Sequence, residues 1–142
     1  MQVRPIPIEQ TRALRHAILR PHQSVEYLVA HESPDAFAVG AFDRVEALVA
    51  VGFVMPDGDP GSWRVRGMAT LPEARGRGAG SAVLQVLLQH ALANGATRVW
   101  CNARIPARTL YERAGFSVIS EEFEVPQIGP HLVMEWRPPP IS

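Results

Sequence analysis

The glycine-rich loop and the apolar pattern after it, residues 75–95, constrain the fold more than any other part of this chain. Gly76, Gly78 and Gly80 alternate with Arg77 and Ala79. Directly afterwards, apolar residues recur at intervals of three and four, at Val83, Leu84, Leu87, Leu88, Ala91 and Leu92. This spacing predicts an amphipathic helix with one buried stripe, and Asn94-Gly95 is expected to end it.

A glycine loop at the start of a helix is suited to binding a phosphate. The first amides of a helix have no partner within the helix, and the helix dipole places positive charge at the same end. Glycines let the backbone approach a phosphate closely, and Arg75 and Arg77 add fixed positive charge. The alternative is a plain glycine turn without a ligand.

Two common phosphate-binding motifs do not fit this loop. All 14 basic residues are arginine, so the lysine of a Walker loop is missing. The dinucleotide fingerprint requires G-x-G-x-x-G and an acidic residue about twenty positions later. Here the spacing is G-x-G-x-G, and the region near residue 100 reads VWCNAR. A nucleotide-binding regulatory module is therefore a disfavoured rival interpretation.

Hydrophobic periodicity and turn residues predict an α+β fold in one unit. Strands are expected over 1–6, 36–42, 46–55, 63–70, 97–104, 116–125 and 131–136. Helices are expected over 8–20, 24–32 and 106–114, in addition to the long helix after the glycine loop. A tight turn at Asp43-Arg44 is predicted to join two of the strands, and the tail 137–142 is expected to be frayed.

Composition narrows the function classes. The formal net charge is zero, with 14 basic and 14 acidic residues, so no nucleic-acid partner is expected. We expect no membrane partner and a cytoplasmic location, because there is neither a secretory signal nor a membrane-spanning run. The single Cys101 cannot form an internal disulfide, and the other side chains lack metal-ligand spacing, so no metal is expected.

The segment RGMATLPEARGRGAGSAVL resembles the acetyl-CoA-binding motif of the GNAT family of N-acetyltransferases. Arg75, Gly78 and Gly80 occupy the motif positions, and LYERAGF at 110–116 resembles the tyrosine-bearing helix of that family. The ending FEVPQIGPHLVM is similar to a poorly characterised subgroup with Gly-Pro-His at this place. The resemblance covers the chain and implies a single domain, 1–142, with a mixed, mostly antiparallel sheet of six to seven strands and about four helices.

The resemblance also implies a binding site for acetyl-CoA as cosubstrate. Backbone groups at the end of one strand would bond the pantetheine arm and the acetyl carbonyl, at Met68, Ala69 and Thr70. Backbone amides of the loop would hold the pyrophosphate, at Gly76, Arg77, Gly78, Ala79, Gly80 and Ser81, with Arg75 beside them. Many relatives carry an asparagine seven residues before the tyrosine. This chain has Arg104 there and Asn102 two positions earlier, so either side chain is a candidate for contacting pantetheine.

The implied chemistry is direct attack of an amine on the thioester, with Tyr111 protonating the departing sulfur. Several residues are candidates for the general base. His131 is a candidate because histidine titrates near neutrality, although a structural histidine bonded to backbone is the alternative. Glu26 and Glu32 are further candidates beside the expected cleft. An acetyl-cysteine mechanism through Cys101 is disfavoured because no basic partner is in view.

The predicted function is therefore acetyl transfer from acetyl-CoA to a primary amine, at a cleft opened by splayed strands near Met68 and Asn102. A non-catalytic acyl-CoA sensor on the same scaffold is the alternative. Polyamine, aminoglycoside, amino acid and protein N-terminus all remain open as acceptors, and Glu121, Glu122 and Glu124 either attract a cationic amine or form a solvated face. A homodimer through the C-terminal strands is left open.

Overall fold

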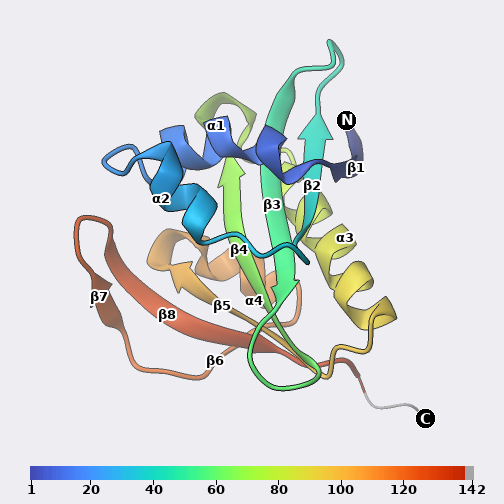
Figure 1. Ribbon diagram of the computed structural model, residues 1–142, viewed down its shortest axis with the longest axis vertical. Helices are drawn as coiled ribbons and strands as arrows, with labels where there is room; N and C mark the ends of the chain where they lie inside the picture. The colour runs from blue at the N-terminus through green and yellow to red at the C-terminus, as the bar shows by residue number, and fades with distance from the viewer. Residues whose placement is uncertain (140–142) are drawn as a thin grey trace.

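A computed structural model describes residues 1–139 and contains one eight-stranded sheet with helices on both faces (Figure 1). The strand order is β1-β2-β3-β4-β5-β8-β6, and β7 pairs with β8. The strands are β1 (Gln2–Ile6), β2 (Phe37–Phe42), β3 (Leu48–Pro56), β4 (Ser62–Thr70), β5 (Arg98–Arg104), β6 (Ser117–Val118), β7 (Phe123–Val125) and β8 (Gly129–Trp136). All pairs are antiparallel except β4 with β5. The α+β prediction is confirmed, with one strand more than expected.

Helix α3 (Ala79–Ala93) packs on one face of the sheet and forms most of the core. Its buried residues include Val83, Leu84, Leu87, Leu88 and Ala91, as the sequence predicts. Leu92 was expected in the same stripe, but it is 48% exposed because it lies one position beyond the face that meets the sheet. The helix ends as predicted: Gly95 adopts a φ of 86°, which glycine tolerates at no steric cost.

The opposite face of the sheet is covered by the first helical segment and by α2 (Val25–Ala30) (Figure 1). The first segment comprises η1 (Ile8–Thr11), α1 (Arg12–Leu14) and a wide π turn, η2 (Arg15–Leu19). Helix α2 begins as predicted, because the Ser24 hydroxyl accepts a hydrogen bond from the amide of Tyr27 at 3.1 Å. These two segments form one wall above the sheet.

Two predictions about strands are wrong. The connection between β2 and β3 is a loop over 43–47 and not a two-residue turn, because the Asp43 carboxylate accepts hydrogen bonds from the amides of Val45 and Ala47. The expected strand over 116–125 is divided into β6 and β7, since the Ser120 hydroxyl accepts a hydrogen bond from the amide of Val133 and interrupts the ladder with β8. Within the expected frayed tail, residues 137–139 have no regular secondary structure, and residues 140–142 lie outside the described part.

A β-bulge in β4 changes which side chains face each side of the sheet. Val51 pairs with Ala69 and Phe53 with Arg66, so Gly52 opposes two residues, Gly67 and Met68. Gly67 accommodates the bulge with a φ of 66°. If side chains alternated strictly between the two faces of the sheet along β4, Met68 would lie on the same face as Arg64 and Arg66. Met68 instead packs against the core beneath α3.

Strands β4 and β5 separate after only three paired positions. Ser62, Trp63 and Arg64 pair with Arg98, Val99 and Trp100, and the strands then continue to Thr70 and Arg104 without pairing. The predicted splay is confirmed. It leaves one edge of β4 without a neighbouring strand, so its backbone groups there are available to a ligand.

Helix α4 (Arg108–Arg113) follows β5 through the short η4 turn (Ile105–Ala107). It lies on the same side as α3, and Tyr111 and Phe116 are buried in the core that α3 forms. Gly115 has a φ of 101° directly after the helix, which confirms its predicted role in ending α4. Among the described residues, none of the helices has the length and apolar character needed to cross a bilayer.

Candidate active site

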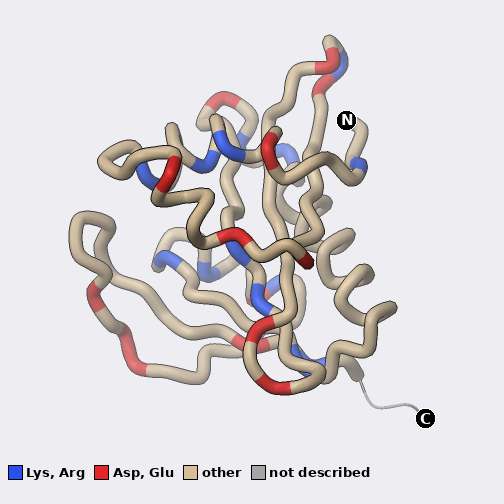
Figure 2. Tube along the Cα trace, viewed as in Figure 1, with Lys and Arg blue, Asp and Glu red and all other residues tan. Residues whose placement is uncertain are grey.

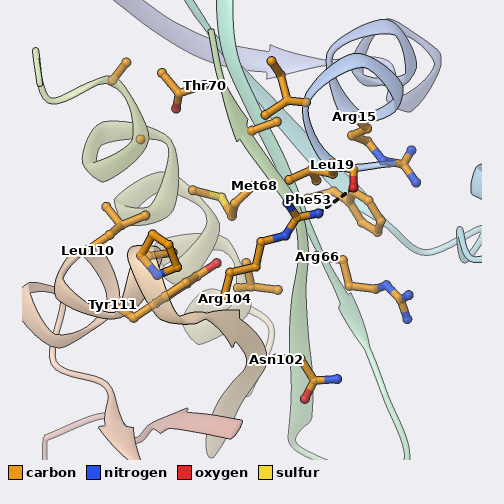
Figure 3. Close-up of a pocket in the computed structure, with 18 of the residues that line it drawn as sticks. Arg15, Leu19, Phe53, Arg66, Met68, Thr70, Asn102, Arg104, Leu110 and Tyr111 are labelled. Carbon is orange, nitrogen blue, oxygen red and sulfur yellow. Dashed lines mark hydrogen bonds between the residues drawn. The ribbon is translucent and has the colours of Figure 1, made fainter. Parts of the chain in front are cut away.

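The gap between β4 and β5 opens into a pocket of about 750 Å³. At one end it is lined by the glycine loop and by η4 and α4, and at the other end by the first helices and by Phe53, and His131 of β8 also lines it. Met68, Ala69 and Thr70 of β4 lie between these two ends. The pocket thus joins the predicted phosphate site to a second compartment above the sheet (Figure 3).

All but one of the residues predicted for the site line this pocket. Those that do are Met68, Ala69, Thr70, Arg75, Gly76, Gly78, Ala79, Gly80, Ser81, Asn102, Arg104, Tyr111 and His131. Arg77 does not line it, and its side chain is exposed. The splayed strands therefore bring together groups from four separate segments of the chain.

The start of α3 is open to an incoming group. Gly78 precedes the helix with a φ of 82°, and no side chain caps the helix there. A Cβ atom placed on Gly76 or Gly78 would meet no atom of residues 1–139 within 4 Å. Open space therefore adjoins the loop at the start of the helix, where the amides of the first turn have no partner within the helix, and this fits a bound phosphate. Arg75 is held beside the loop by donating from Nε to the carbonyl of Thr70 at 3.3 Å.

Tyr111 is 5% exposed and its hydroxyl points into the pocket between Met68 and Arg104 (Figure 3). Burial raises the pKa of Tyr111 well above its usual value, and the neighbouring Cys101 adds to the shift. The phenol therefore keeps its proton throughout the neutral range. Burial likewise raises the pKa of the Cys101 thiol to about 12, which removes the thiolate that an acetyl-cysteine mechanism needs.

His131 lies on β8 directly across from Arg104 of β5. Its Nδ1 is 2.9 Å from the carbonyl oxygen of Gly129. Because a carbonyl only accepts, Nδ1 carries the proton of the neutral ring and Nε2 has the lone pair. The ring is thus bonded to backbone, as the alternative interpretation of this residue expects, while it keeps one nitrogen able to accept a proton.

The two candidate pantetheine contacts differ in their surroundings. Arg104 donates from Nη2 to the carbonyl of Leu19 at 2.5 Å and so bridges β5 to the first helical segment (Figure 3). Asn102 is exposed, and within residues 1–139 its side chain has no hydrogen-bond partner. Asn102 is therefore the side chain that is free to contact a ligand.

The acidic residues considered from the sequence lie elsewhere. Glu26 and the acidic residues at β7 and just before it, which are Glu121, Glu122 and Glu124, are exposed and do not line the pocket. The acidic positions at β7 lie at the outer edge of the chain trace (Figure 2). Glu32 is buried in an ion pair, with Oε2 2.7 Å from Nη1 of Arg15 and Oε1 2.8 Å from Nη2 of Arg12. Its carboxylate is therefore engaged in holding the helices together. In residues 1–139 no three His, Cys, Asp or Glu side chains are grouped to hold a metal.

Among the pocket residues that sequence reasoning missed are Arg64 and Arg66. Both project from β4 on the face opposite α3, toward the first helices. The sequence contained a pattern that could have predicted them. In WRVR two arginines alternate with apolar residues, so they share one face of the strand, and this strand leads into the glycine loop.

Comparisons with known proteins agree with this geometry. The profile of the Acetyltransferase (GNAT) family matches residues 6–116. The chain is 37% identical to the N-acetyltransferase YitI of Bacillus subtilis (strain 168), itself uncharacterised, over 94% of each chain.

Solved structures have the same fold at low sequence identity. An aminoglycoside 6'-N-acetyltransferase complexed with coenzyme A superimposes with a TM-score of 0.80 at 14% identity, covering 99% of this chain and 100% of that one. The ribosomal-protein-S18-alanine N-acetyltransferase of Escherichia coli gives a TM-score of 0.77 at 13% identity, covering 96% and 92%. The chain therefore belongs to the acetyltransferase (GNAT) family and is an acyl-CoA-dependent acetyltransferase.

Proposed function

We propose that this protein transfers the acetyl group of acetyl-CoA to a primary amine by direct attack, as one domain formed by residues 1–142. The observation that carries the proposal is the continuous pocket between the splayed strands, which connects the open start of α3 with the buried hydroxyl of Tyr111. The donor and the acceptor can thus enter from opposite ends and meet beside Met68–Thr70.

Each part of the pocket suits one part of acetyl-CoA. The amides of Gly76 through Ser81 would hold the pyrophosphate, since they lie at the positive end of a helix and the space beside Gly76 and Gly78 is open. The unpaired edge of β4 at Met68–Thr70 would bond the pantetheine arm and polarise the acetyl carbonyl through its N–H groups. Asn102 is the better placed of the two candidate side chains for a further contact with pantetheine.

In the proposed reaction each bond change and each proton transfer has a defined partner. The neutral amine nitrogen attacks the thioester carbon, so a C–N bond forms and the C–S bond breaks. Tyr111 donates its proton to the departing sulfur, and general acid help of this kind contributes roughly 10²–10⁴-fold. The amine gives up one proton to Nε2 of His131 or to water.

The alternative is an acyl-CoA sensor without turnover. It uses the same glycine loop but has no use for a protonated tyrosine next to the thioester. The direction of the Tyr111 hydroxyl, into the pocket beside Met68, favours the enzyme.

Calorimetric titration with acetyl-CoA and with desulfo-CoA tests the proposal. We expect micromolar binding that Gly78→Glu abolishes, because the new carboxylate would occupy the space intended for the pyrophosphate. Gly58→Glu is the matched control. Gly58 has the same φ of 82° and equally open space, but it lies in the β3–β4 loop. Absence of binding to the unmodified protein would overturn the proposal, and binding without acetylation of any amine would favour the sensor.

A further inference from the structure

The acceptor end of the pocket is strongly cationic. Seven of the residues that line the pocket are arginine, and within residues 1–139 none is aspartate or glutamate. Arg75 and Arg113 lie at the end formed by the glycine loop and α4, and Arg15 is neutralised by Glu32. Four guanidinium groups remain above the sheet near the place of the acetyl group, those of Arg20, Arg64, Arg66 and Arg104.

These four groups come from three elements that the fold brings together. Arg64 and Arg66 project from β4, Arg104 projects from β5, and Arg20 follows the π turn of the first helical segment. Figure 3 shows the guanidinium groups of Arg66 and Arg104 on the same side of the pocket, away from Leu110 and Thr70. All four side chains are half-buried.

None of the four has a carboxylate partner among the described residues, where every ion pair involves other arginines. Arg66 makes no side-chain hydrogen bond within residues 1–139, and the buried Nε of Arg64 has no partner there. The Arg64 guanidinium instead stacks over Trp100, 4.4 Å from the ring centroid. Buried donors without acceptors are costly, and an anion in the pocket would supply acceptors to these guanidinium groups.

Burial lowers the pKa of Arg64, Arg66 and Arg104, and repulsion from other arginines adds to this at Arg66 and Arg104, while the Asp57 carboxylate opposes it at Arg64 and Arg66. Burial lowers the pKa of Arg66 to about 10, and repulsion from Arg64, Arg20 and Arg15 adds to the effect. Burial followed by repulsion from Arg20 also lowers the pKa of Arg104. All of these groups still carry their charge at neutral pH. The free protein therefore holds a concentration of positive charge that a bound anion would relieve.

We infer that the acceptor is a small amine that also carries a carboxylate or phosphate group, held by the guanidinium groups of Arg66, Arg64, Arg104 and Arg20. Guanidinium groups bind both anions with paired, charge-assisted hydrogen bonds. Arg66 is two residues before Met68 in β4, so an anion bound there lies within one small molecule's length of the acetyl site. This inference rests on the proposed acetyltransferase function.

The same charges disfavour the other acceptor classes that the sequence left open. A polyamine or an aminoglycoside would bring several positive charges against four guanidinium groups, and like charges placed together are costly. The likeness to an aminoglycoside acetyltransferase, at 14% identity, concerns the fold. Positive surroundings also favour the neutral form of an amine. The cluster thus helps to prepare the nucleophile in a pocket to which residues 1–139 contribute no acidic side chain.

Anion binding to the protein saturated with desulfo-CoA tests the inference, because the pyrophosphate site is then filled. Inorganic phosphate and succinate are titrated into the unmodified protein, Arg66→Gln and Arg108→Gln. Arg108 is 51% exposed and lies outside the pocket, so its variant is matched in net charge. We expect saturable binding of at least one anion, at least tenfold weaker in Arg66→Gln and unchanged in Arg108→Gln.

Acetylation of matched amines separates the two anion classes. Alanine is compared with alaninamide and phosphoethanolamine with ethanolamine, with spermidine as the polycation. A higher kcat/KM for the anionic member of a pair supports the inference and identifies carboxylate or phosphate as the preferred group.

Two results would overturn the inference: no saturable anion binding, or the same affinity in Arg66→Gln as in the unmodified protein. Preferred acetylation of spermidine would overturn it while leaving the acetyltransferase proposal intact. Failure of desulfo-CoA itself to bind would instead contradict the proposed function.

Discussion

Arg15 and Glu32 form a buried ion pair, with 2.7 Å between Nη1 and Oε2 and side chains only 5% and 7% exposed. Arg15 also donates to the carbonyl of Leu28 at 3.2 Å, and its guanidinium lies 4.7 Å from the centre of the Phe53 ring. These contacts fasten the π turn to the segment after α2 and to the sheet. The helices that wall the acceptor compartment are thus held by charge as well as by apolar packing.

Glu32→Gln is expected to destabilise the protein by about 3 kcal/mol, because it leaves the buried Arg15 without its counter-charge. Urea unfolding measures the difference. Glu46→Gln is the control, since Glu46 is 64% exposed and pairs with Arg4 on the surface. This variant should lower the free energy of unfolding by less than about 1 kcal/mol. Equal costs for the two variants would contradict a structural role for the buried pair.

The same carboxylate predicts a pH dependence of stability. Burial alone would raise the pKa of Glu32, but hydrogen bonds from Arg12 and Arg15 outweigh it and lower that pKa. A lowered folded-state pKa contributes stability above the unfolded value that is lost as pH falls through the folded value. Unfolding free energies between neutral pH and about pH 3 should therefore fall more steeply for the unmodified protein than for Glu32→Gln. If the unfolding free energies of the two proteins fall with pH at the same rate, other groups cause the loss of stability in acid.

Gly67→Ala is expected to disturb the bulge that shapes the pocket. Its Cβ would lie 2.8 Å from Cε1 of Phe53, at a φ of 66° that side chains rarely adopt. We expect the free energy of unfolding to fall by about 2 kcal/mol because of the strain and the close contact. We also expect a lower kcat/KM, because Met68–Thr70 would shift relative to the bound acetyl group. Gly58→Ala has a similar φ but meets open space, so it reports the backbone strain alone. If both variants lose the same stability and keep full activity, the close contact at Phe53 is unimportant.

Arg66→Gln is expected to stabilise the free protein while it weakens anion binding. Removing a half-buried charge that Arg64, Arg20 and Arg15 repel should raise the Tm by about 2 °C. Thermal unfolding without ligand measures this, with exposed Arg44→Gln as the control. A fall in Tm would show that the Arg66 side chain contributes more through packing than it costs through repulsion.

Tyr111→Phe is expected to reduce kcat by roughly 10²–10⁴-fold with little change in the affinity for desulfo-CoA, since only the proton donor is lost. Because burial raises the pKa of Tyr111 well above its usual value, its proton remains in place as pH rises through the neutral and mildly alkaline range. The kcat of the unmodified protein should therefore not decline there through loss of this proton. A variant with full kcat would exclude the tyrosine as the acid.

Much of this fold was readable from local patterns. The spacing from Val83 to Ala91 predicts the buried stripe of α3, because a helix repeats every 3.6 residues wherever it lies. The glycine loop and the segment ending in Gly115 likewise report backbone conformations that short-range sterics decide. These same local features carry the resemblance to the family and most of the predicted binding residues.

Other features depended on contacts between distant residues. The bulge at Gly67 reversed the side of the sheet that Met68 faces, since pairing with β3 had to absorb an extra residue in β4. Glu32, a candidate base from the sequence, is bound by Arg12 and Arg15 from a segment about twenty residues earlier. No local pattern reports such a partner.

The sequence by itself determined the amphipathic elements, the phosphate-binding loop and the family. The tertiary structure decided the character of the acceptor compartment, because Arg20, Arg64, Arg66 and Arg104 come from three separate segments whose charges meet only when the strands splay and the first helices cover them. Electrostatic interaction depends on distance in space and on burial, and a chain with zero net charge gives no sign that its arginines will gather in one pocket.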